Sequence, residues 1–209
     1  MNSFSYDRIG PGHDRTDLSE PRQAEPGEWP KFEAALAVVN RDVTATLPGQ
    51  DALILMVAPS WQPLPASGTD RGAVHVAMLD GRWQGNALNA VDLEEGELPE
   101  PDDAMAALTL VAEAAQETVM ELRWQVWPVC RTHKIGMHVR PAGTADDWCG
   151  GEAVASDPVV WWCQGGRDGS GHDVCLVGEL AATLPGKERR ALRRGERGDQ
   201  RGAVRPARR

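Results

Sequence analysis

The sequence lacks any apolar stretch near the roughly 20 residues that a helix needs to span the hydrocarbon core of a bilayer. Its first residues, Met1 to Arg8, also lack the apolar segment of a secretory signal peptide. We therefore expect a cytoplasmic protein without a membrane-spanning segment. In that compartment its four cysteines stay reduced, which favours metal ligands over disulfides.

Motifs of common catalytic sites are missing as well. The chain has no G-x-S-x-G elbow for a nucleophilic serine and no H-E-x-x-H helix for a catalytic zinc ion. Its glycine-rich segment before His172 is not followed by the Lys-Ser/Thr pair of a phosphate-binding loop. No residue is therefore predicted to be catalytic, and the sequence favours a role other than catalysis.

Charge is distributed unevenly along the chain. No basic residue occurs between Trp83 and Leu122, whereas seven acidic residues crowd the stretch from Asp92 to Asp103. Residues 187–209 carry ten Lys or Arg against three acidic residues, a balance of +7 that leaves −16 for the rest of a chain whose total is −9. An acidic surface repels nucleic acid, but the basic segment has the charge to bind phosphates. A short helix is expected there from about Lys187 to Arg194.

The first half of the chain predicts a small α+β domain over residues 28–125, after a polar segment, 1–27, that we expect to be disordered. Two apolar stripes at helical spacing predict helices, one beginning near Pro30 and one after Asp102 or Asp103, either of which suits the N-cap. Between them, three strands are expected at 52–57, 73–79 and 82–88, the last two joined by an Asp80-Gly81 turn. Short connections make this three-stranded sheet antiparallel.

Residues 126–180 predict a zinc-ribbon-like lobe, built on a hairpin of 159–163 against 173–177, followed by a basic disordered tail, 181–209. Thiolates and imidazoles are the preferred zinc ligands. A sharp backbone turn can bring a cysteine and a nearby histidine onto one ion. Cys149 and Cys175 are the alternatives to His172 as fourth ligand. Tryptophans in this lobe are expected to supply its packing rather than a stacking platform for bases. The predicted zinc ligands are Cys130, His133, Cys163 and His172.

The combination of Trp127-Pro128-x-Cys130-x-x-His133, Trp162-Cys163 and Gly171-His172 resembles a set of small uncharacterised α+β proteins from high-GC actinobacteria. The excess of Arg over Lys, nineteen to three, agrees with such a genome. The resemblance covers roughly residues 28–180 and implies the same α+β domain with a C-terminal Cys/His lobe. It implies no activity.

Three functions are compatible with these features. The first is a non-catalytic interaction or regulatory protein with a structural zinc site and an unknown protein partner, because four protein ligands leave no open position on the metal. The second is a protein that binds nucleic acid through residues 187–209. The third is a metalloenzyme with an open site at Cys130, His133 and Cys163 and with Glu152 or Asp168 as its base. The first is favoured.

Overall fold

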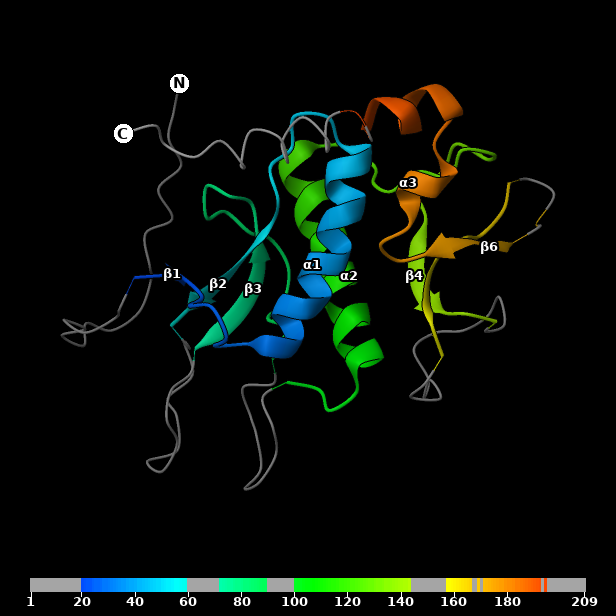
Figure 1. The fold of residues 1–209 in the computed structure, drawn as a ribbon. Helices are drawn as coiled ribbons and strands as arrows, with labels where there is room; N and C mark the ends of the chain where they lie inside the picture. Colours follow the sequence, from blue (N-terminus) through cyan, green and yellow to red (C-terminus); the bar gives the residue numbers. More distant parts are fainter. Residues whose placement is uncertain are drawn as a thin grey trace, which may run out of the picture.

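Two long helices, α1 (Pro30–Thr46) and α2 (Ala104–Arg123), lie side by side in the centre of the structure, between two three-stranded antiparallel sheets (Figure 1). The computed structural model describes residues 20–59, 72–89, 100–143, 157–166, 169, 171–192 and 194. This arrangement confirms the predicted α+β class. The first sheet contains β1 (Arg22–Gln23), β2 (Ile54–Ala58) and β3 (Ala73–Ala77), and the second contains β4 (His138–Pro141), β5 (Val159–Cys163) and β6 (His172–Leu176).

The first sheet contains the two central strands that the sequence predicts, but its third strand is a different one. β2 and β3 pair antiparallel, with Leu55 opposite Val76. The outer edge of β2 is taken by β1, which falls within the segment 1–27 that we expected to be disordered. The two residues of β1 show no alternation of apolar and polar side chains that would predict a strand. They are held by backbone pairing with β2.

The predicted strand over residues 82–88 is wrong. The Asp80-Gly81 turn forms, but the backbone of the returning chain, all of which the structure describes, pairs with β3 only near its two ends. It makes a bridge between Trp83 and Ala77 and a hydrogen bond from the N–H of Leu88 to the carbonyl of Val74 at 2.7 Å. Between these two points, a side chain of α2 takes the place of strand pairing. The Thr118 hydroxyl on α2 donates to the carbonyl oxygens of Val76 at 2.9 Å and Gln84 at 3.1 Å. At Gln84 the chain therefore bonds to α2 and not to β3.

Both helices begin where the sequence predicts, but their first backbone N–H groups are satisfied in different ways. Asp103 accepts a hydrogen bond from the backbone N–H of Ala106 at 2.9 Å and is the N-cap of α2. Helix α1 has no side-chain cap of its own. The carboxylate of Glu100, which precedes α2, instead accepts from the backbone N–H groups of Lys31 and Phe32 at 3.0 and 2.9 Å. One carboxylate therefore satisfies two unpaired amides of α1 and links it to the start of α2.

The second sheet packs against the helices and has no core separate from theirs. The predicted hairpin is confirmed as β5 and β6, and β4, which the sequence did not predict, pairs with the other edge of β5. A single buried cluster runs from the apolar faces of α1 and α2 into this sheet, where it includes Trp127, Met137, Val159 and Trp161. The segment 126–180 is therefore one layer of a shared core.

After β6 the chain forms α3 (Leu180–Thr183) and then a helical segment over residues 186–192. The short helix expected near Lys187 is thus present. The prediction of disorder from residue 181 is wrong for these helical residues. Leu180, the first residue of α3, is buried in the shared core, and Leu184, just after α3, is also buried. Residues 195–209, the rest of the basic tail, lie outside the described residues.

A buried carboxylate joins α1 to the second sheet. Asp42 is fully buried and accepts hydrogen bonds from Nε1 of Trp161 at 2.7 Å and from the backbone N–H groups of Gly178 at 2.6 Å and Leu180 at 2.7 Å. Burial raises the pKa of Asp42, although these three donors act in the opposite direction. Nearby, Nε1 of Trp127 donates to the hydroxyl of Thr46 at 2.9 Å.

We predict that Asp42→Asn lowers the free energy of unfolding by about 1–3 kcal/mol, because an amide replaces one acceptor oxygen by a donor and leaves a buried N–H without a partner. Urea unfolding followed by tryptophan fluorescence measures the change. Asp51→Asn, at an exposed position, is the matched control and should be nearly neutral. Equal stability of the two variants would show that the Asp42 carboxylate does not hold the two layers together.

Candidate metal centre

A tight turn between α2 and β4 carries the first two predicted ligands, Cys130 and His133. The turn is closed by hydrogen bonds from the backbone N–H of Lys134 to the carbonyl of Cys130 at 2.8 Å, and from the N–H of Cys130 to the carbonyl of Ile135 at 2.9 Å. Lys134 adopts a left-handed conformation with φ of 59°. This reversal places the thiol of Cys130 and the imidazole of His133 on the same side of the turn, 3.9 Å apart.

The β5–β6 hairpin carries the other two predicted ligands, Cys163 and His172. They are cross-strand partners in this antiparallel pair, so their side chains lie on the same face of the sheet. A register shift beside Trp161 and Trp162 leaves one residue of β6 unmatched and aligns His172 with Cys163. The eight residues between the two ligands are therefore a hairpin connection, and strand pairing brings the ligands together across it.

The four ligand atoms converge on one point, lying within 4.8 Å of one another. The Cys130 Sγ is 3.9 Å from Nε2 of His172, and the Cys163 Sγ is 3.3 Å from Nδ1 of His133. Zinc bonds of about 2.3 Å to sulfur and about 2.0 Å to nitrogen at a tetrahedral angle separate the sulfur from the nitrogen by about 3.5 Å. The observed spacings of 3.3 to 3.9 Å bracket this value, so the group has the size of a tetrahedral Cys2His2 site.

The two thiols of the group are buried, with exposed fractions of 1% for Cys130 and 0% for Cys163, and the two histidines are half-buried. Burial opposes ionisation of Cys130, but hydrogen bonds from the backbone around His133 and from Cys163 outweigh it and lower its pKa. Burial raises the pKa of Cys163. A bound divalent cation would favour the thiolate form of both, since a metal deprotonates coordinating thiols.

Cys175, one alternative fourth ligand, is not part of this group. It lies on β6 opposite Trp161, half-buried against the core. Burial, with the negative charges of Asp42 and Glu179, raises the pKa of Cys175 to about 12. Its thiol therefore stays protonated and behaves as an apolar side chain. The other alternative, Cys149, and the two acidic residues considered as catalytic bases, Glu152 and Asp168, lie outside the described residues.

An ion pair beside the ligands was not predicted from the sequence. Asp173, which follows His172, accepts hydrogen bonds from Nη2 of Arg140 at 2.9 Å and from the backbone N–H of Gly143 at 3.1 Å. The Arg140 guanidinium also lies over the Trp162 ring, 4.4 Å from its centroid. These contacts tie β4 to β6 across β5 next to His172. An arginine and an aspartate 33 residues apart gave no local signal of this pairing.

Comparison of the chain with protein-family models, with curated proteins and with solved structures gave no match. The resemblance to small actinobacterial α+β proteins stays a prediction. Among the described residues, no helix is both long and apolar enough to cross a membrane. What can be inferred about function therefore depends on the geometry of the Cys/His group and of the surface around it.

We predict that His172→Ala lowers the zinc content of the purified protein, whereas Cys175→Ser leaves it unchanged. His172 supplies a ligand atom to the group, and the Cys175 thiol does not. Plasma mass spectrometry of both variants, normalised to protein concentration, measures the difference. The assignment of the fourth ligand is wrong if Cys175→Ser loses the metal and His172→Ala retains it.

Proposed function

We propose that the protein is a non-catalytic interaction or regulatory protein in which Cys130, His133, Cys163 and His172 hold a structural zinc ion. The observation that carries the proposal is the convergence of four ligand atoms within 4.8 Å, from the turn after α2 and both strands of the β5–β6 hairpin. Two thiols and two imidazoles favour zinc among the common metals because these ligands suit it and provide four positions.

A structural site fits this group better than a catalytic one. Catalytic zinc ions have three protein ligands and a fourth position open to water or substrate. A metalloenzyme that used only Cys130, His133 and Cys163 would need His172 to stand apart from the metal. Its Nε2 instead lies 3.9 Å from the Cys130 Sγ, within the same group. All four positions of a tetrahedral zinc ion would then be occupied by protein.

Zinc in this position would stabilise the end of the β5–β6 hairpin at which Cys163 and His172 lie. At one end of β5 the hairpin reaches Cys163, and the metal would join this end to the turn at Cys130 and His133. That turn has no helix of its own and depends on a few backbone hydrogen bonds. A metal link across separate chain segments contributes directly to the free energy of folding. The reduced thiols that it needs fit the cytoplasm.

We predict that the purified protein contains about one zinc ion per chain and that removal of the zinc lowers its stability. A ligand held at a free concentration 1000 times its Kd adds about 4 kcal/mol to the free energy of unfolding. Thermal unfolding with added zinc and with a chelator measures the effect, and plasma mass spectrometry measures the metal.

Variants distinguish the effect of losing the metal from a general loss of packing. Cys163→Ser should abolish the difference between the zinc and chelator conditions, and His133→Asn should do the same at a half-buried position. Cys175→Ser should retain the full difference. Wild-type protein that contains no zinc and unfolds at the same temperature in both conditions would refute the structural zinc site.

A further inference from the structure

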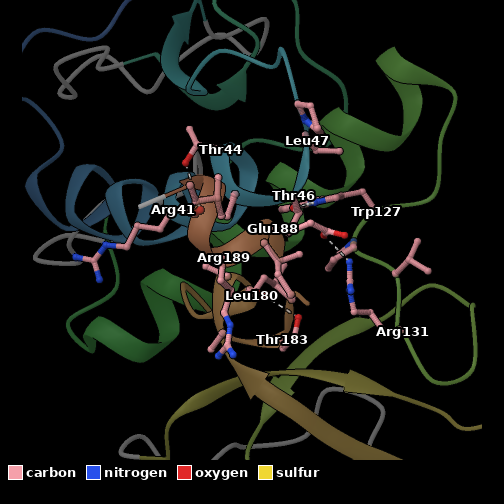
Figure 2. A pocket seen from close by; sticks show the side chains of 18 of the residues that line it. Arg41, Thr44, Thr46, Leu47, Trp127, Arg131, Leu180, Thr183, Glu188 and Arg189 are labelled. Atoms are coloured by element: carbon pink, nitrogen blue, oxygen red, sulfur yellow. Dashed lines mark hydrogen bonds and ion pairs between the residues drawn. The ribbon is translucent and has the colours of Figure 1, made fainter. Parts of the chain in front are cut away.

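An open groove of about 1370 Å³ lies beside the metal-binding turn. Its walls are the C-terminal half of α1, the turn from residue 125 to residue 134, α3 and the helical segment 186–192. Figure 2 shows Arg41 and Arg131 on opposite sides of the segment that carries Arg189. The groove is therefore formed by parts of the chain that are far apart in sequence.

The lining of the groove combines apolar side chains with positive charge. Val126 and Val129 have exposed fractions of 53% and 41%, high values for valine in a folded protein. Four lining residues are cations and one, Glu188, is an anion, so the groove carries +3 on a chain whose net charge is −9. The four cations are Arg41, Arg131, Lys134 and Arg189.

The helical segment 186–192 is packed loosely over this groove. Residues 187–191 are all exposed, and Leu192 is only half-buried. An ion pair of 2.9 Å between Arg131 and Glu188, both of them solvent-accessible, links the segment to the metal-binding turn. Surface ion pairs contribute little stability. The described residues of the chain thus leave the space between this segment and the body of the protein open.

We propose that this groove binds a short acidic peptide segment with apolar side chains, contributed by a partner protein. Charge complementarity selects the occupant, because +3 on an otherwise acidic protein attracts carboxylates and repels basic chains. The exposed Val126 and Val129 and the half-buried Leu192 offer contacts for apolar side chains between those carboxylates. The interaction resembles the insertion of an amphipathic segment into a hydrophobic groove.

Single-stranded nucleic acid fits the groove less well. Its binding sites combine a positive track with exposed aromatic rings on which bases stack. The aromatic residue in this lining is Trp127, which is 2% exposed and holds its Nε1 hydrogen bond to Thr46. Apolar aliphatic side chains offer no comparable stacking surface for bases.

The groove and the metal centre share one turn. Arg131 and Lys134, which line the groove, alternate with the ligands Cys130 and His133 over five residues. A metal that fixes the ligand side of this turn therefore also fixes the side that faces the groove. This coupling rests on the proposed zinc site, whereas the groove itself does not. Binding of the acidic segment should consequently be tighter in the zinc-loaded protein than after chelation.

Selection from a library of short random peptides against the full-length, zinc-loaded chain tests the proposal. We expect the selected peptides to contain both Asp or Glu and Leu-like residues. The peptide selected most strongly is then synthesised with a fluorescent label and titrated by fluorescence anisotropy. The Arg41→Glu/Arg189→Glu variant, which reverses two exposed charges of the lining, should weaken binding at least about tenfold. The control Arg82→Glu reverses an exposed charge in the turn after β3, outside the groove lining, and should bind normally.

Several results would overturn the proposal. These are the selection of basic peptides or of none, equal affinity of the groove variant and the wild type, and tighter groove-dependent binding of a uridine oligonucleotide than of the peptide. Sedimentation that shows self-association lost in the groove variant would identify a second copy of the chain as the occupant instead. Circular dichroism of each variant confirms that it is folded.

Measurements before and after removal of the metal distinguish a failure of this inference from a failure of the proposed function. Peptide affinity and zinc content are measured on the same samples before and after chelation. Lower affinity after chelation supports the coupling of groove and metal. Groove-dependent binding by purified protein that contains no zinc before any chelation would refute the zinc site and retain the groove. A zinc-containing protein without peptide binding would refute the groove and retain the zinc site.

Discussion

The buried carboxylate of Asp42 is the interaction on which the arrangement of the two halves depends. An ionised group costs several kcal/mol to bury unless hydrogen bonds replace its lost hydration. Here three donors do so. Trp161 belongs to β5, Gly178 to the turn after β6, and Leu180 is the first residue of α3. The turn needs glycine at Gly178, where φ is 91° and an added Cβ would lie 2.6 Å from the Val38 side chain. The requirement to satisfy one charge thus fixes the distance between helix and sheet.

The same contacts determine where the four proposed metal ligands lie. Trp161, which donates to Asp42, is two residues before Cys163 on β5, and β6 begins at His172 as its paired strand. Trp127, which anchors the other side of the sheet to Thr46, is three residues before Cys130 and packs edge-on against Trp161 with ring centroids 5.4 Å apart. Each pair of ligands is therefore positioned by a buried tryptophan that is itself held by α1. Packing, as predicted, is the role of these two tryptophans.

Predictions from the sequence succeeded where a local pattern of residues determines the structure. The helices follow from their apolar spacing, with Asp103 as the cap of α2, and the β5–β6 hairpin follows from its apolar run and glycine-rich connection. The proximity of Cys130, His133, Cys163 and His172 follows from residue types that suit one ion. The predictions failed at β1, at β4 and at the strand expected over 82–88, where pairing depends on distant segments. Asp42 could have been found. It follows Val39 by three residues within the apolar stripe of α1, and a charge on such a face needs buried partners.

The positions of the groups with shifted pKa values distinguish the groove from a catalytic cleft. Catalytic sites tend to place groups with shifted pKa values in the cavity that receives the substrate. Burial raises the pKa of the Asp42 and Glu113 carboxyls and lowers that of His75, yet none of the three lines the groove. The charges that do line it are mostly arginines, whose planar, permanently ionised guanidinium groups suit the recognition of carboxylates rather than proton transfer. The chemistry of this surface therefore fits docking, with the proposed zinc ion fixing one wall of the groove.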